Sequence, residues 1–178
     1  ILAYEDFLLR FLNNDTIEDP QFSGTEIFIY TEYIDDSTFR LVDYDSIIKK
    51  YEKNISSELI ELLSIKTSES KQPAVKNGTL QLTYEELLQR TLRTENLLLA
   101  HGSEDALKAS ALEYYKNYLF LLLAGSDSSP AFDYDNGVFS LVAREVYANF
   151  IVEYPETVLP ILLCFFFFYL NNIKYTID

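Results

Sequence analysis

Hydrophobic residues recur at helical spacing over most of the chain, and the pattern is clearest after residue 80. Between residues 84 and 99, one face collects Tyr84, Leu87, Leu88, Thr91, Leu92, Leu98 and Leu99. Thr83 and Glu86 stand at the spacing of a capping box, in which two side chains satisfy two backbone amides at the start of a helix. We predict a helix that begins after Thr83 and ends at His101-Gly102, where glycine suits a left-handed cap.

Three further helices are predicted to follow. Ser103 is placed to cap the first of them, and the short connection predicts an antiparallel helical hairpin. This helix ends before Gly125 and carries Leu107, Ala111, Tyr114, Tyr118 and Leu122. Another is marked by Val138, Leu141, Val142, Val146 and Phe150, and the last follows Pro155. The pattern predicts a C-terminal bundle of about four helices.

The N-terminal half predicts smaller elements. Apolar residues at Tyr4, Phe7, Leu8, Phe11 and Leu12 indicate an amphipathic helix. Residues 25–34 are β-branched and aromatic, and with the turn at Asp35-Asp36-Ser37 they predict a β-hairpin. Short helices are predicted from Ser46 and, with Ser57 as N-cap, through residues 59–63. The fold class is therefore mainly α, a helical bundle with smaller N-terminal helices and a β-hairpin.

The polar stretch Lys66–Thr79 contains Pro73 and Gly78 and predicts a loop. It is the best internal boundary in the sequence. The 65 residues before it are few for an independent core, so we predict a single domain over residues 1–178 with a sub-boundary in the 66–79 loop.

An almost entirely apolar run, TVLPILLCFFFFYL, occupies Thr157–Leu170. Its 14 residues fall short of the roughly 20 that a bilayer crossing needs, Pro160 interrupts it, and no positive flank adjoins it. We predict a buried core helix rather than a transmembrane span, with Cys164 as a buried structural thiol. A dimer seam at Ile161–Leu170 would bury the run equally well, so a homo-oligomer is the open alternative.

Charge and side-chain chemistry exclude several functions. With 28 acidic and 14 basic residues the net charge is −14, which disfavours nucleic acid as a partner. A single histidine, His101, excludes metal sites built from several imidazoles. Its predicted place at a helix C-terminus is explained by the helix dipole. No phosphate-binding glycine loop or G-x-S-x-G sequence is present. These features favour a protein that is not an enzyme and uses no cofactor.

The acidic loop SDSSPAFDYDNG at residues 126–137 is the one candidate metal site, through Asp127, Asp133, Asp135 and Asn136. It does not fit an EF-hand: with Gly137 at position six, Phe132 and Tyr134 fall where ligands are required. An irregular calcium site remains an alternative to a solvated turn.

A possible repeat links Ala111–Tyr115 and Ala143–Tyr147, 32 residues apart. The stretch Ala143–Leu159, AREVYANFIVEYPETVL, resembles the helix and turn of a tetratricopeptide unit, although the 34-residue period and the W-x-x-L-G signature are missing. The resemblance implies a scaffold that grips a peptide on a concave surface lined by Tyr114, Tyr118 and Tyr147.

These observations lead to one functional hypothesis and two alternatives. We expect a non-catalytic helical interaction module whose partner is a protein or peptide. Because the chain begins at Ile1 without a methionine, we expect a trimmed chain, the ectodomain of a surface-anchored protein with an extracellular or cell-surface location. The alternatives are the tetratricopeptide-like scaffold, and a calcium-dependent binder or enzyme that uses the Asp127–Gly137 loop.

Overall fold

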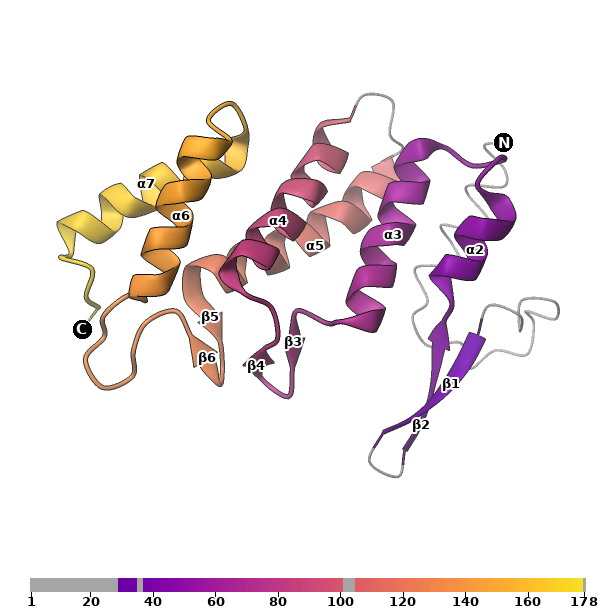
Figure 1. Cartoon of the computed structure of the whole chain (residues 1–178), viewed down its shortest axis with the longest axis horizontal. Coiled ribbons are helices and arrows are strands. Elements are labelled where there is room, and N and C mark those ends of the chain that lie inside the picture. Colours follow the sequence, from indigo (N-terminus) through magenta and orange to yellow (C-terminus); the bar gives the residue numbers. More distant parts are fainter. Residues whose placement is uncertain (1–28, 35–36, 101–104, 178) are drawn as a thin grey trace. The chain divides into compact units, whose positions relative to one another are not determined.

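The computed structural model describes residues 29–34, 37–100 and 105–177 (Figure 1). The chain forms two compact units: the first comprises Ile1–Gln72 with Gly102–Lys108, and the second Pro73–His101 with Ala109–Asp178. The prediction of a mainly α fold is confirmed. The predicted helix over Tyr4–Leu12 and the Ser103 cap lie outside the described residues. The helix that follows Thr83 ends at Leu99, with Ala100 as its C-cap, so its predicted end at His101-Gly102 is wrong by two residues.

The described elements follow one order three times along the chain, a short antiparallel hairpin and then two helices. The sets are β1 (Ile29–Ile34), β2 (Ser37–Val42), α2 (Tyr44–Tyr51) and α3 (Ser57–Lys71); β3 (Val75–Lys76), β4 (Thr79–Leu80), α4 (Tyr84–Leu99) and α5 (Asp105–Ala124); and β5 (Gly125–Ser126), β6 (Ser129–Pro130), α6 (Leu141–Glu153) and α7 (Val158–Asn172). The first helix of each set begins at a side-chain cap, supplied by Asp43, Thr83 and Ser140.

This order differs from the 32-residue recurrence seen in the sequence. Ala111 lies in α5, the second helix of its set, whereas Ala143 lies in α6, the first helix of the next. The two similar segments therefore occupy non-equivalent places.

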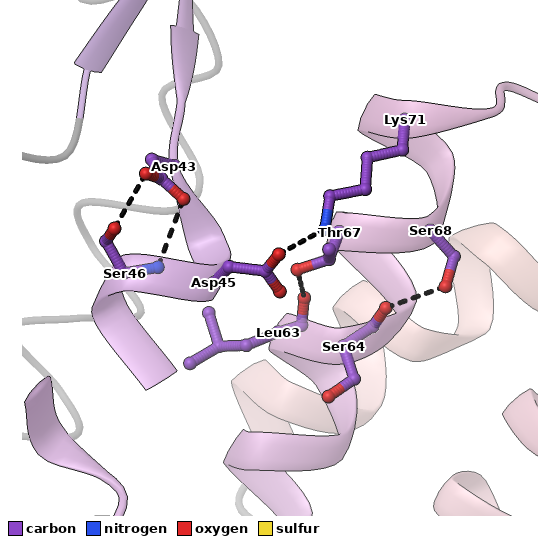
Figure 2. Close-up of polar contacts among 8 residues, drawn as sticks. All are labelled: Asp43, Asp45, Ser46, Leu63, Ser64, Thr67, Ser68 and Lys71. Carbon is purple, nitrogen blue, oxygen red and sulfur yellow. Dashed lines mark hydrogen bonds and ion pairs between the residues drawn. The ribbon is translucent and has the colours of Figure 1, made fainter. Parts of the chain in front are cut away.

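In the first unit, α2 packs against α3 around an apolar core. That core includes Val42, Tyr44, Ile47, Leu59, Leu62 and Leu63. Asp43 begins α2: its carboxylate accepts hydrogen bonds from the Ser46 amide at 3.0 Å and the Ser46 hydroxyl at 2.7 Å (Figure 2). Ser56, one residue earlier than predicted, caps α3 by accepting from the Leu59 amide at 3.2 Å.

The predicted loop over Lys66–Thr79 is wrong in its first part, because α3 continues to Lys71. Hydroxyl groups that ordinarily favour loops here donate to carbonyls one turn back: Thr67 to Leu63 at 2.9 Å and Ser68 to Ser64 at 3.0 Å (Figure 2). Lys71 also pairs with Asp45 of α2. The division between the units falls after Gln72, within the predicted boundary region. The single-domain prediction stays a prediction.

The cap at Asp43 gives a prediction for the first unit. Replacing Asp43 with alanine removes the acceptor at the start of α2 and is expected to lower the free energy of unfolding by about 1 kcal/mol. The Ser46 hydrogen bond is the main cause that lowers the pKa of Asp43. A lowered folded-state pKa means that this contribution is present above the ordinary aspartate pKa and is lost as pH falls through the folded-state value.

Urea unfolding at neutral pH and at pH about 3, below the ordinary aspartate pKa of about 3.9, measures this effect. The difference between wild type and Asp43→Ala should shrink at the lower pH, whereas Asp43→Asn, which can still cap, should stay close to wild type at neutral pH. An alanine variant that matches wild type at neutral pH would contradict the assigned cap.

In the second unit, α4 packs against α6 and α7, and α6 packs against α7. The predicted capping box is confirmed: the Thr83 hydroxyl accepts from the Glu86 amide at 3.2 Å, and the Glu86 carboxylate accepts from the Thr83 amide at 2.9 Å. The core joins all four helices and includes Leu87, Leu88, Tyr118, Leu122, Phe139, Tyr147, Leu159 and Leu163.

Two tight turns in the second unit depend on backbone in the left-handed region. Asn77 and Gly78 have φ angles of 52° and 76°, the left-handed pair that a two-residue hairpin turn requires between β3 and β4. Gly125, with φ of 80°, ends α5 and begins β5. A Cβ at Gly125 would lie 2.4 Å from the Ser129 carbonyl oxygen, so only glycine fits this turn.

Candidate interaction surface

Helix α7 is anchored in the second unit through its inner face. Leu159, Leu163 and Leu170 are fully buried there. Phe166 meets Phe139 edge to face, with ring centroids 5.3 Å apart, and Phe167 lies 6.3 Å from the Tyr147 ring. Aromatic pairs at these separations add to the stabilisation that comes from burial alone.

A buried carboxylate on α4 fixes the start of α7. Glu95 is 3% exposed, and its two carboxylate oxygens accept hydrogen bonds from the Val158 amide at 2.9 Å and the Tyr115 hydroxyl at 3.2 Å. Thr157, the residue before the helix, makes no side-chain cap. Glu95 therefore satisfies an amide that would otherwise lack a partner and places a negative charge at the positive end of the helix dipole.

Tyr115 keeps its proton in this arrangement. Burial is the largest cause that raises the pKa of Tyr115, and the negative charge of the Glu95 carboxylate is the second; together they raise it to about 12. At neutral pH the phenol therefore remains a donor. Glu95 joins α4, α5 and the first turn of α7 through these two bonds.

The outer face of α7 carries apolar side chains that the rest of the second unit leaves exposed. This face, called the α7 outer face below, consists of Val158, Ile161, Leu162, Phe165, Phe168 and Tyr169. Phe165 and Phe168 are 68% and 69% exposed. The prediction of a buried core helix is therefore wrong for half of the helix, because both of its faces are apolar and only one meets the core.

Cys164 lies in the same helix and is exposed, so the prediction of a buried thiol is wrong as well.

No charged residue occurs from Thr157 to Ile173. Across the described ranges, no helix is both long enough and apolar enough to span a membrane.

In the acidic loop, side-chain oxygens of Asp133 and Asn136 accept hydrogen bonds from backbone amides of the same loop. One oxygen of the Asp133 carboxylate accepts from the amides of Asp135 and Asn136, at 2.9 and 3.1 Å, and the Asn136 side chain accepts from the Val138 amide at 2.9 Å. The Tyr134 hydroxyl donates to the backbone carbonyl of Asp127. Within the part of the chain that the structure describes, no three His, Cys, Asp or Glu residues form a group that could hold a metal ion.

The three tyrosines predicted to line a concave surface have separate environments. Tyr118 and Tyr147 are 2% and 0% exposed and belong to the core, so a peptide cannot reach them in this fold. Tyr114 is partly buried beside Tyr118, with ring centroids 6.2 Å apart. The Tyr147 hydroxyl donates to the Leu122 carbonyl at 2.7 Å, an internal role that the sequence pattern did not indicate.

A cleft of about 440 Å³ runs along α4 and is lined by Gln89, Arg90, Leu92, Arg93 and Asn96. Its volume lies within the range of small-molecule sites. All five lining residues belong to one helix, and one of the polar side chains, Gln89, donates to the Tyr154 hydroxyl at 3.3 Å. The cleft does not indicate a particular ligand.

His101 lies outside the described residues. Comparisons of the chain with known protein families, with curated proteins and with solved structures found no match. The functional interpretation therefore depends on the surface of the second unit itself.

Sequence reasoning missed both the exposure of the α7 outer face and the role of Glu95. A signal for Glu95 was present, since it follows Thr91 by four residues and precedes Leu98 by three, on the stripe assigned to the core. A charged residue in such a stripe indicates a buried polar partner.

Proposed function

We propose that this chain is a non-catalytic interaction module that binds a protein partner through the α7 outer face. The observation that carries the proposal is six neighbouring apolar side chains exposed on one helix of a folded unit. Exposed apolar side chains scattered singly are ordinary, whereas a contiguous patch of several hundred Å² marks an interaction site.

The size of the face supports this proposal. A fully covered aromatic side chain buries about 150–250 Å², so Phe165, Phe168 and Tyr169, each more than half exposed, present on the order of 300 Å² together. The three aliphatic residues enlarge this area. The face therefore reaches the range of roughly 300–600 Å² found for the largest patch on a typical monomer.

The composition of the face also fits a protein contact. Interface cores are enriched in aromatic residues and depleted of charge, and the segment from Thr157 to Ile173 is uncharged. Glu95 and the inner leucines hold the helix rigidly, so little order has to be gained when a partner binds.

Site-specific photo-crosslinking in the native source tests the proposal. A benzophenone amino acid in place of Phe168 should form an adduct with whatever covers the face, and mass spectrometry of the adduct should identify a protein. The same probe in place of Val152, which is 81% exposed on α6, should not form that adduct. No protein adduct from position 168, or the same adduct from both positions, would refute the proposal.

A further inference from the structure

We propose that the partner is a second copy of this chain, and that the outer faces of two α7 helices pair antiparallel across a two-fold axis. This inference rests on the proposed function of the α7 outer face. It adds the identity of the partner and the direction in which the two helices run.

The spacing of the exposed residues suits the pairing of two helices. Val158, Ile161, Phe165 and Phe168 follow one another at intervals of three, four and three residues. This is the spacing of the contact seam in a coiled coil, where each residue fits between residues of the facing helix. Leu162 and Tyr169 widen the seam on one side. A two-fold pair uses the same patch on both copies, so one such seam is sufficient.

Charge favours pairing of this segment with itself. With a net charge of −14, most surfaces of the chain would repel a second copy. The segment from Thr157 to Ile173 carries no charge and brings no like charges together. It therefore permits self-association without the electrostatic cost that the rest of the chain imposes.

The charges that flank the segment select the antiparallel direction. Glu156 precedes α7 and Lys174 follows it, and both are exposed. In an antiparallel pair, Glu156 of one copy lies at the same end as Lys174 of the other, whereas a parallel pair brings like charges together. The two helix dipoles also oppose each other favourably in the antiparallel arrangement.

The available area indicates a reversible dimer. A standard stable interface buries about 800 Å² on each partner. The three aromatics present on the order of 300 Å², and the aliphatic residues with a polar rim extend the contact toward the lower end of interface sizes. We therefore expect association that depends on concentration in the micromolar range and above.

Sedimentation velocity over micromolar to millimolar concentrations tests the dimer. Wild type should shift from the 20.6 kDa monomer toward twice that mass. The double variant Phe165→Asp with Phe168→Asp should remain monomeric throughout, and Val152→Asp should behave as wild type. Far-ultraviolet circular dichroism and thermal unfolding establish that the variants are folded. A folded wild type that stays monomeric at the highest concentration, or a folded double variant that still dimerises, overturns the inference.

Charge reversal tests the direction of the pair. Lys174→Glu should raise the dimer dissociation constant about three- to tenfold, since two equivalent rim pairs are lost in a two-fold dimer. Adding Glu156→Lys to the same chain should restore most of the affinity, because the opposite charges face each other again. A swapped variant that stays as weak as Lys174→Glu overturns the antiparallel arrangement.

The crosslinking experiment separates this inference from the proposed function. An adduct between two copies of the chain supports both. An adduct with a different protein, together with a monomeric wild type, refutes the second-copy inference and leaves the interaction module intact. No adduct at all refutes both.

Discussion

Replacing Tyr147 with alanine is expected to lower the free energy of unfolding of the second unit by about 3–5 kcal/mol, the range found when large aromatic residues are truncated in protein cores. Tyr147 is completely buried. Its ring lies 5.7 Å from that of Tyr84 and 6.1 Å from that of Phe139. The alanine variant leaves a cavity at the centre of α4, α6 and α7 and removes the donor to the Leu122 carbonyl.

The variant Tyr147→Phe separates the contribution of the hydroxyl to stability from the contribution of the ring. It keeps the packing and loses the 2.7 Å hydrogen bond to Leu122, so we expect a loss of about 1–2 kcal/mol. Urea unfolding of the full chain, followed by circular dichroism, measures both variants. An alanine variant no less stable than the phenylalanine variant would contradict the central position assigned to the ring.

The burial of Tyr147 also predicts that the free energy of unfolding falls at alkaline pH. Burial raises the pKa of Tyr147 above its ordinary value. A raised folded-state pKa means that the stability is fully present below the unfolded value of about 10 and is lost as pH rises above it. Tyr147→Phe should therefore lose less stability than wild type over this alkaline range.

Replacing Glu95 with alanine is expected to cost the second unit about 1–3 kcal/mol, because it removes the buried carboxylate that accepts from two partly buried donors. These donors are the Val158 amide at the start of α7 and the Tyr115 hydroxyl on α5. Hydrogen exchange should show the loss first in the amides of the first turn of α7, since their anchor is removed.

Two control variants accompany Glu95→Ala. One removes only the charge of the Glu95 side chain, and the other removes a carboxylate from an exposed position of α4. Glu95→Gln keeps one acceptor oxygen and should cost about 1 kcal/mol. Glu85→Ala removes an exposed carboxylate from the same helix and should change stability by less than about 0.5 kcal/mol. If Glu95→Ala were as mild as Glu85→Ala, the anchoring of α7 by Glu95 would be wrong.

Local signals in the sequence were sufficient to predict the start of α4. Thr83 and Glu86 act on backbone amides a few residues away, so their effect does not depend on the rest of the fold. The β1–β2 hairpin was predicted at its turn for the same reason, and the paired strands confirm it. Helices α4, α5 and α6 were predicted because their apolar positions recur at helical spacing, whereas α7 was predicted from the continuous apolar run after Pro155.

The orientation of α7 could not be predicted, for a physical reason. Periodicity identifies the buried side of a helix only when the other side is polar. In α7, the buried Leu163 and the exposed Phe165 are both apolar, so the sequence contains no contrast between the faces. The extent of α3 was missed because the bonds from Thr67 and Ser68 to carbonyls one turn back allow helical structure in a polar stretch.

The places of the candidate tyrosines were missed for a different reason. A tyrosine on a helix stripe serves equally well as a core residue or as part of a binding surface. Tyr147 is a core residue because the Leu122 carbonyl, 25 positions earlier, accepts its hydroxyl. A hydrogen bond between residues so far apart in the chain cannot be recognised from the spacing of residue types in the sequence.

The exposure of α7 is the central claim, and the reactivity of Cys164 tests it most directly. Cys164 is the only cysteine of the chain and is exposed on this helix. In native protein diluted well below micromolar concentration, so that the proposed dimer would be dissociated, a thiol reagent should modify Cys164 at a rate close to that of the urea-unfolded chain. A native thiol that reacts at least a hundredfold more slowly would show that α7 is covered within the monomer, and the interaction surface would have to be abandoned.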